Sequence, residues 1–255
     1  MRGEDMLKEK FDLTGKTAFV TGSARGIGRA IALGFAEYGA RVIVHGSRPS
    51  EALSRTLADV RAFAPDSEAC PFDLSDPAAV AANCPREVDV LVCNASVQSN
   101  LKWDEVPLET MLTQMQVNFN ATFQMFQAVH PHMKARGWGR LITVGSVQEF
   151  RPHPEMPVYA ASKSAQENLV RNVARQVARE GITVNNLCPG VFATDRNAAA
   201  LSRPDYAERV FNAIPLHFAA DAEDAAGAAL LLATDAGRYI TGANLVVDGG
   251  LRLPG

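Results

Sequence analysis

Seven short apolar segments, each followed by a stretch with helical spacing, constrain the fold of this chain more than any other feature. Most of them do not alternate apolar with polar residues, which is typical of strands buried on both faces of a parallel sheet. Strand–helix alternation favours helices on both faces of that sheet. The sequence therefore predicts an α/β, doubly wound fold with seven parallel strands, at residues 16–20, 41–45, 68–72, 88–93, 140–146, 182–188 and 244–247.

The expected helices are residues 28–39, 49–63, 77–83, 108–136, 156–181 and 221–234. No repeat and no Pro/Gly/Ser linker divides the chain, and 255 residues with 47% apolar composition suffice for one sizeable core. Residues 1–255 are therefore expected to form a single domain, with a charged N-terminal tail at 1–12. Residues 191–216 look irregular and follow the sixth strand, where such sheets hold ligands, so they are the candidate substrate loop.

Charge and cysteine usage limit the classes of partner. The net charge of −3 and the pI of about 6.0 predict no nucleic-acid partner. The start of the chain lacks an apolar signal, and no run approaches the ~18 apolar residues that a membrane span needs. The four cysteines show no C-x-x-C spacing, and Cys93 and Cys188 lie in apolar runs. Buried free thiols in a reducing cytoplasm are the prediction.

The HPH sequence at His130 and His132 resembles part of a metal site. Residues at i and i+2 do not share a helix face, and Pro131 is expected to interrupt the helix. No metal is predicted.

Three glycines follow the first strand and open the first helix. Gly22 allows a tight turn, and Gly26 and Gly28 allow close approach of a phosphate to the backbone at a helix N-terminus. The spacing is G-x-x-x-G-x-G and does not match the commoner G-x-G-x-x-G fingerprint. By itself the stretch is either a phosphate-binding loop or a structural glycine turn.

A serine, a tyrosine and a lysine are spaced for proton transfer. Ser146 ends the fifth strand, and Tyr159 and Lys163 lie one turn apart if the next segment is helical. A phenol beside an ammonium group suits proton transfer to or from a carbonyl or alcohol oxygen.

Six short motifs occur in a characteristic order: TGSARGIG at 21–28, CNAS at 93–96, Asn118, Ser146, YAASK at 159–163 and PGVFAT at 189–194. Together with the ending YITGANLVVDGG, they resemble the short-chain dehydrogenase/reductase family from about residue 13 to 251. The resemblance implies a Rossmann-like fold and reversible hydride transfer between a nicotinamide cofactor and a carbonyl or secondary alcohol. It also implies a homotetramer.

The resemblance implies four catalytic residues. Tyr159 would be the acid/base, and Lys163 with the oxidised nicotinamide would favour its phenolate over the free phenol, whose pKa is about 10. Lys163 would also hold the nicotinamide ribose. Ser146 would polarise the substrate oxygen, and Asn118 would hold a water that links the lysine to solvent.

The resemblance also implies a set of cofactor contacts. The usual loop motif after the fourth strand ends in glycine, whereas this chain has Ser96; a serine with positive φ would cost roughly 1 kcal/mol or shift the backbone. Asp73 would read the adenine amino group, or instead begin a helix. The expected cofactor-binding residues are Gly22, Ser23, Arg25, Gly26, Ile27, Gly28, Ser47, Arg48, Asp73, Leu74, Asn94, Ala95, Ser96, Tyr159, Lys163, Pro189, Gly190, Phe192 and Thr194.

The end of the second strand predicts a preference for NADP(H). An NAD-selective enzyme places a carboxylate there, but this chain has no acid before Glu51. Arg48 and Arg25 could pair with a 2′-phosphate, and Ser47 could donate to it, or both arginines are surface charges. Use of NAD(H) stays open.

The expected pocket entrance is polar. Gln148 and Glu149 follow Ser146, and Gln98 and Asn100 follow the fourth strand. This composition favours a sugar, polyol or sugar acid, with substrate contacts from Ser146, Gln148, Gln98 and Tyr159. Nearby Arg151, His153 and Glu155 would face either substrate or solvent. The alternatives are a 3-oxoacyl thioester reductase and a non-catalytic protein that senses the dinucleotide.

Overall fold

The structure, a computed structural model, describes residues 6–253, apart from the side chains of Met6 and Arg196. A seven-stranded sheet runs through its middle in the order β3-β2-β1-β4-β5-β6-β7. All six strand pairs are parallel, which confirms the predicted α/β fold. The strands are β1 Thr17–Val20, β2 Arg41–Val44, β3 Glu68–Ala69, β4 Val90–Cys93, β5 Gly139–Val144, β6 Ile182–Pro189 and β7 Asn244–Val247.

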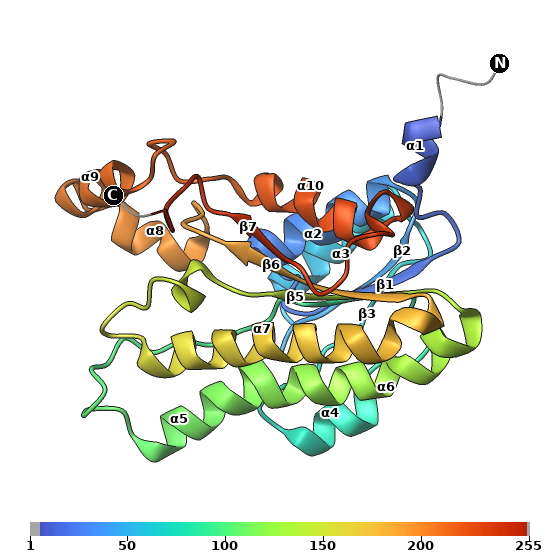
Figure 1. Cartoon of the computed structure of the whole chain (residues 1–255), viewed down its shortest axis with the longest axis horizontal. Coiled ribbons are helices and arrows are strands. Elements are labelled where there is room, and N and C mark those ends of the chain that lie inside the picture. The colour runs from blue at the N-terminus through green and yellow to red at the C-terminus, as the bar shows by residue number, and fades with distance from the viewer. Residues whose placement is uncertain (1–5, 254–255) are drawn as a thin grey trace.

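Helices cover both faces of this sheet. Figure 1 shows α2, α3 and α10 on one face and α4 to α7 on the other. The main helices are α2 Gly26–Glu37, α3 Glu51–Arg61, α4 Pro77–Asn83, α5 Leu108–Met115, α6 Ala121–Arg136, α7 Pro157–Val177 and α10 Ala222–Ala233. Apolar side chains of the strands point alternately into the two layers. Phe35 and Val92 lie in one buried cluster, and Leu91 and Met125 lie in the other.

Four segments differ from the sequence-based expectation. The predicted tail contains a short helix, α1 Met6–Lys10. The supposedly irregular residues 191–216 form two helices, α8 Asp195–Leu201 and α9 Pro204–Ala213. The third predicted strand is short because Pro71 has no N–H to donate, although Cys70 and Phe72 continue the pairing with β2.

The long helix expected at 108–136 is divided by a π-helical turn, Gln116–Asn120, between α5 and α6. Pro131 lies inside α6 and does not interrupt it, so that part of the prediction was wrong. The helix tolerates the proline's missing hydrogen bond and ends instead at Gly137, whose φ is 61°. The remaining short helices are Val147–Glu149, Ala178–Glu180 and Asp235–Gly237.

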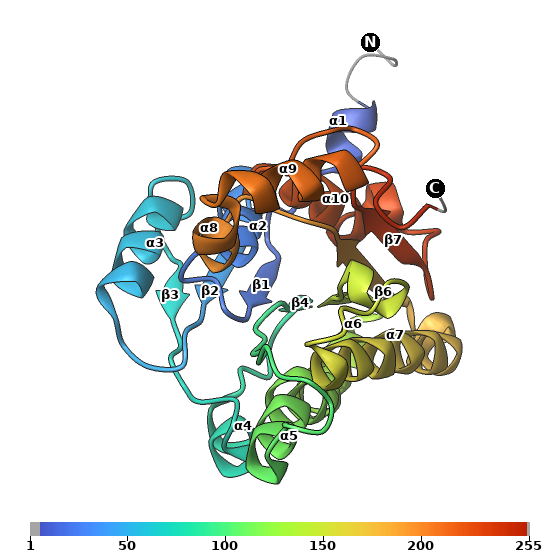
Figure 2. The same ribbon diagram turned by 90° about the vertical axis from the view of Figure 1, so that its left-hand side faces the viewer.

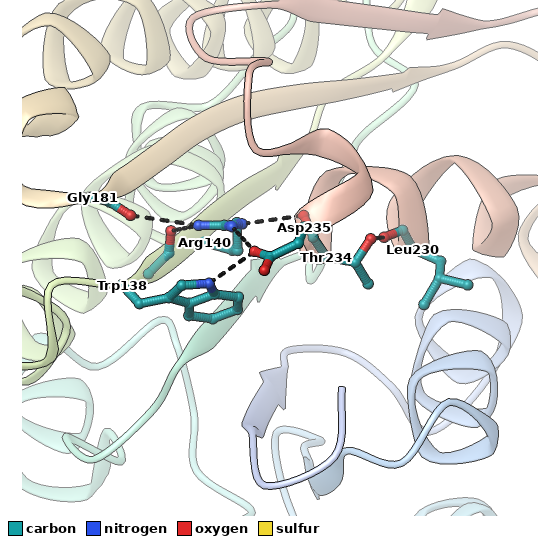
Figure 3. Close-up of polar contacts among 7 residues, drawn as sticks. Trp138, Arg140, Gly181, Leu230, Thr234 and Asp235 are labelled. Carbon is teal, nitrogen blue, oxygen red and sulfur yellow. Dashed lines mark hydrogen bonds and ion pairs between the residues drawn. The ribbon is translucent and has the colours of Figure 1, made fainter. Parts of the chain in front are cut away.

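A buried arginine ties β5 to the end of α10 at the amino edge of the sheet (Figure 3). The Arg140 side chain is 3% exposed and its Nη2 lies 2.9 Å from Asp235 Oδ1. Trp138 Nε1 donates to the same carboxylate oxygen, and the guanidinium carbon lies 4.1 Å from the Trp138 ring centroid. Burial lowers the pKa of Arg140, while the Asp235 carboxylate acts in the opposite direction. This cluster fastens the layer that contains α10 to the central strands.

No helix within residues 6–253 is long and apolar enough to span a membrane.

Candidate active site

The predicted site residues gather at the carboxyl edge of the sheet, which faces the viewer in Figure 2. Thr21, His45, Asn94 and Gly190 directly follow β1, β2, β4 and β6. Ser146 lies two residues after β5. The carboxyl ends of parallel strands share one edge, so these segments come together although they are far apart in the sequence.

Tyr159 and Lys163 lie one turn apart near the start of α7, as predicted. The tyrosine is 7% exposed and the lysine 1%. Lys163 Nζ lies 5.7 Å from the Tyr159 ring centroid. The ammonium donates to the Val144 carbonyl at 2.7 Å and to Gln166 Oε1 at 2.8 Å. These two acceptors fix the position of the charge beside the phenol.

Ser146 is held by the turn that follows it. Its Oγ accepts a hydrogen bond from Gln148 N at 3.2 Å, and its own N–H donates to Glu149 Oε1 at 2.9 Å. This reciprocal arrangement is a capping box at the start of the short helix Val147–Glu149. Since the hydroxyl already accepts from a backbone amide, its proton can be donated to a substrate oxygen.

Asn118 reaches the tyrosine indirectly. It lies in the π-helical turn and is fully buried, and its amide donates to Val97 O at 2.9 Å and to Ser162 Oγ at 3.0 Å. Ser162 Oγ in turn donates to the Tyr159 carbonyl at 2.7 Å. The Asn118 side chain therefore braces both α7 and the loop after β4. The predicted water relay at this residue stays a prediction.

A second chain of contacts leads from the lysine to Asn118. Gln166 Nε2 donates to Thr122 Oγ1 at 2.8 Å, and Thr122 Oγ1 lies 3.3 Å from the Asn118 carbonyl oxygen. Sequence reasoning missed Gln166 and Thr122. The signal for Gln166 was its position three residues after Lys163, on the same helix face.

Residues 21–28, here called the glycine loop, are packed against the loop after β4. Gly22 has a φ of 64°, and a Cβ there would lie 2.9 Å from the Ala95 Cα. Asn94 Nδ2 donates to the carbonyls of Thr21 and Gly22 at 2.9 and 3.2 Å. The first turn of α2 has no side-chain cap at Arg25, so its backbone N–H groups are available to an anion. This arrangement fits the pyrophosphate of a dinucleotide, and Ile27 lies in that first turn.

His45, which was not predicted as a site residue, supports the same loop. Its Nδ1 accepts from Gly22 N at 3.1 Å and its Nε2 lies 3.0 Å from the Phe72 carbonyl. These partners require the neutral tautomer with the proton on Nε2. Burial lowers the pKa of His45 to about 4, so the ring is neutral at physiological pH.

Ser23 and Asp73, both predicted cofactor contacts, have hydrogen-bond partners within the protein. The buried Ser23 hydroxyl donates to Val20 O at 2.8 Å and accepts from His45 N at 2.8 Å. Asp73 Oδ1 accepts from Ser75 N at 2.8 Å, and the N-cap of α4 is Asp76. Ser96 carries no left-handed strain, because His217 is the only non-glycine residue with positive φ in the described part of the chain. Leu74 is buried at 4% exposure.

The segment expected to hold the 2′-phosphate lies at the surface. Ser47 and Arg48 are exposed just after β2, and Arg25 is exposed at the start of α2. Glu51, the first carboxylate after β2, is bound to Arg55 at 2.8 Å. Within the described residues, neither Arg25 nor Arg48 forms an ion pair with a protein carboxylate.

Residues 189–194 connect β6 to α8 opposite the glycine loop. Gly190 N donates to Val247 O at 2.9 Å, and Phe192 is buried at 2% exposure. A Cβ built on Gly26 would lie 3.5 Å from Thr194 Cγ2, so the threonine and the glycine loop are neighbours. Pro189 is the last residue of β6.

The predicted pocket entrance is braced by Gln148. Its Oε1 accepts from His153 N at 2.7 Å, and its Nε2 lies 3.6 Å from Met156 Sδ. His153 Nδ1 accepts from Glu155 N at 3.2 Å, which leaves the ring proton on Nε2. Gln148 therefore shapes the loop before α7, and Gln98 lies half-buried in the loop after β4.

The two histidines of the HPH sequence have separate partners. His130 Nε2 lies 2.6 Å from Glu180 Oε2, and His132 Nε2 lies 3.7 Å from Asp89 Oδ1. Over the residues that the structure describes, no group of three or more His, Cys, Asp or Glu side chains could hold a metal ion. All four cysteines are free, as predicted.

Comparisons with known proteins agree with this geometry. A family model described as enoyl-(acyl carrier protein) reductase matches residues 22–252. Gluconate 5-dehydrogenase of Gluconobacter oxydans (strain 621H) is 33% identical over 247 residues, which cover 94% of this chain and 96% of that protein.

Two solved structures are similar over nearly their whole length. A gluconate 5-dehydrogenase from Burkholderia cenocepacia J2315, in complex with NADP and tartrate, has a TM-score of 0.90 at 32% identity, covering 97% of this chain and 99% of the other. A 3-oxoacyl (acyl-carrier-protein) reductase from Agrobacterium tumefaciens C58, with NADP bound, has a TM-score of 0.92 at 36% identity, covering 98% and 99%.

Proposed function

This chain belongs to the short-chain dehydrogenase/reductase family, and we propose that within it the protein is an NADP(H)-dependent oxidoreductase whose substrate is a sugar acid or a similar hydroxylated molecule. The family membership makes it an NAD(P)-dependent enzyme that acts on CH–OH groups. The observation that carries the proposed chemistry is the buried Lys163 ammonium 5.7 Å from the Tyr159 ring.

The mechanism follows from the positions of three side chains. In the oxidation direction, Tyr159 Oη accepts the alcohol proton as the C–O bond gains double-bond character. Ser146 donates a hydrogen bond to the same oxygen and orients it. Lys163 stabilises the phenolate by its charge, and Gln166 and Val144 O hold that charge in place. A bound nicotinamide would supply the hydride acceptor for the carbinol carbon, and the hydride donor in the reverse reaction.

The preference for NADP(H) is supported by charge. Arg25 lies in the glycine loop and Arg48 lies just after β2, and both are exposed, whereas Glu51 is engaged by Arg55. A guanidinium pairs well with a 2′-phosphate, and an NAD-binding carboxylate is missing from the end of β2. The NADP complexes of similar proteins are consistent with this choice.

The cofactor preference can be measured directly. Catalytic efficiency with NADPH should exceed that with NADH, and Arg48→Ala should reduce the ratio of these two efficiencies. Equal use of both cofactors by the unaltered enzyme would overturn the preference.

A hydroxylated substrate is supported by the polar entrance and by the relatives. His153 carries its ring proton on Nε2, and Gln98 lies in the facing loop. The names of several relatives refer to gluconate. The alternative substrate is a 3-oxoacyl thioester. The similarity to the 3-oxoacyl (acyl-carrier-protein) reductase from Agrobacterium tumefaciens supports this alternative.

A substrate panel separates these alternatives. We expect NADP⁺-dependent oxidation of aldonates such as gluconate, and NADPH-dependent reduction of keto-aldonates, measured by absorbance of the reduced cofactor. Turnover of acetoacetyl thioesters without turnover of aldonates or polyols would replace the proposed substrate class with the alternative one.

Substitution of the tyrosine tests the proton-transfer role. Tyr159→Phe should lower kcat by roughly a thousandfold or more, because the acid/base group is lost, while the affinity for NADPH changes little. Fluorescence titration of the cofactor provides the binding measurement. If the variant kept its activity, another group would carry the proton. If the unaltered protein bound NADPH but reduced no carbonyl compound, a sensing role would be favoured.

We further propose a homotetramer that works in the cytoplasm. Leu108 and Leu112 on α5 are 67% and 55% exposed, and Phe123 on α6 is 42% exposed. A second copy of the chain could cover these apolar side chains. Light scattering measures the assembly directly, and a monomer would contradict it. The four free cysteines agree with a reducing compartment.

A further inference from the structure

The Glu149 carboxylate is bound by three N–H groups that come from separate parts of the chain. Oε1 accepts from Ser146 N at 2.9 Å, and Oε2 accepts from Asn244 Nδ2 at 2.8 Å. Asn186 Nδ2 lies 3.1 and 3.2 Å from the two oxygens. The carboxylate thereby joins the turn after β5 to β6 and β7, next to the serine of the active site.

This contact leaves the Ser146 backbone little freedom. Glu149 N donates back to the Ser146 carbonyl at 2.9 Å, and this backbone bond adds to the two side-chain bonds of the capping box. A Cβ built on Gly145 would lie 2.0 Å from Glu149 Oε1, so the carboxylate packs directly on the preceding peptide. Asn186 is itself fixed, because Thr143 Oγ1 donates to its Oδ1 at 2.5 Å. The position of the Ser146 hydroxyl therefore depends on a rigid network behind it.

The carboxylate also acts through its charge. The partners that donate hydrogen bonds to it are neutral, and burial raises the pKa of Glu149, while these bonds and the Lys163 ammonium on α7 lower it. Burial raises the pKa of the Cys188 thiol on β6, and the Glu149 carboxylate adds to this shift. Lys163 Nζ donates to the Val144 carbonyl, two residues before the Ser146 N–H that Glu149 binds, so the two charges contact the same short segment. The negative charge of Glu149 therefore opposes the formation of a second negative charge on Tyr159.

We propose that Glu149 is a positioning residue of the active site: its carboxylate fixes Ser146, and its negative charge offsets Lys163 and so sets the pH at which Tyr159 ionises. This role rests on the proposed function, since it concerns the same serine, tyrosine and lysine. It gives one side chain two separable effects, one of placement and one of charge.

The effect of the Glu149 charge on the ionisation of Tyr159 can be measured by NMR, without an assay of enzyme activity. The chain has four tyrosines, so labelling with 13Cζ-tyrosine and comparison with Tyr159→Phe assigns the Tyr159 signal in an NMR titration. In Glu149→Gln the Tyr159 signal should titrate at lower pH than in the unaltered protein. Glu87→Gln removes an exposed carboxylate at the amino end of β4 and should leave the titration unchanged. Coincident Tyr159 titrations in E149Q and the unaltered protein would overturn the electrostatic role.

The effect of placement is tested by a variant that keeps the charge. Glu149→Asp retains the carboxylate on a shorter arm, so its Tyr159 titration should stay near that of the unaltered protein while kcat/KM falls roughly tenfold or more. The loss should largely disappear when E149D is introduced into Ser146→Ala, because the two changes then act on one group. Unaltered kcat/KM in E149D, or full additivity with S146A, would refute the placement role, and E149D still decides this if E149Q does not fold.

The two proposals can fail independently. If the unaltered protein oxidised or reduced no compound of the panel, the proposed function would fall, whereas the tyrosine titration would still report on Glu149. If turnover were found but neither variant behaved as expected, only the role of Glu149 would be rejected.

Discussion

At the scale of single residues, hydrogen-bond partners determine the protonation state of a side chain at this site. His45 is the clearest case, because its Nδ1 accepts a hydrogen bond from the Gly22 amide and its Nε2 lies at the Phe72 carbonyl. Both contacts require a neutral ring with the proton on Nε2. The sequence shows a histidine at the end of β2 but does not show its partners. The contact of His45 with the glycine loop is visible only in the three-dimensional structure.

Acid should weaken the fold and the glycine loop through His45. Its pKa is about 4 in the folded chain against 6.5 in the unfolded one, so between these values the unfolded state binds more protons. The neutral ring contributes its full stabilising effect above pH 6.5. This contribution is lost as the pH falls towards 4, and the total loss in the free energy of unfolding is about 3 kcal/mol. His45→Gln should flatten this dependence in urea denaturation between pH 4 and 7.

A matched control for that experiment is His217→Asn. His217 is exposed and has a φ of 62°, which asparagine tolerates. This variant should keep the pH dependence of the unaltered protein. An unchanged slope in His45→Gln would show that other groups cause the loss of stability in acid.

Secondary-structure elements were predictable where one pattern dominated. The seven strands and the order of strand and helix followed from buried apolar runs. The capping box of Ser146 and Glu149 has the S-x-x-E pattern, although the sequence analysis did not predict it. In contrast, the π-helical turn around Asn118 and the helices of 191–216 depend on tertiary packing, which local periodicity does not report. The partners of Glu149 on β6 and β7 lie 37 and 95 residues away, beyond any short motif.

Two glycines of α2 should respond in opposite ways to alanine. A Cβ on Gly28 would lie 2.6 Å from the Gly22 carbonyl oxygen and 2.4 Å from Asn94 Nδ2. Gly28→Ala should therefore displace the glycine loop and weaken NADPH binding roughly tenfold or more. A Cβ on Gly34 would lie 3.5 Å from the Ala226 Cβ, an ordinary contact. Gly34→Ala should raise the free energy of unfolding by about 0.5–1 kcal/mol.

Denaturation in urea and fluorescence titration of NADPH give the two measurements for each variant. Equal NADPH affinity in Gly28→Ala and Gly34→Ala would contradict the close packing of the glycine loop.

At the scale of the whole molecule, the two edges of the sheet have different tasks. The carboxyl edge carries the site residues, whereas the amino edge is held by Arg140, Asp235 and Trp138 (Figure 3). A change at the amino edge should consequently alter stability without altering the chemistry.

Asp235→Ala tests this separation. The substitution leaves the buried Arg140 guanidinium without its carboxylate, but Asp235 is half-exposed and solvent screens part of the effect. We expect a loss of about 2 kcal/mol in the free energy of unfolding, with kcat unchanged at temperatures where the protein stays folded. Asp104→Ala, at an exposed loop position, is the control and should change stability little. A large fall in kcat for folded Asp235→Ala would contradict the separation.

The order in which the strands join the sheet bears on how the protein is made on the ribosome. From β4 onward, each later strand in the sequence lies beside the one before it in the sheet, with β5, β6 and β7 in turn. The strands that flank the glycine loop therefore come first in the sequence, whereas α10, which packs on α2, comes late. Ser146 is synthesised at mid-chain, yet the network behind it needs Asn244 from the last strand. A chain that ends before β7 would lack the Asn244 contact to Glu149, so we expect it to hold the turn at Ser146 less firmly than the full chain does.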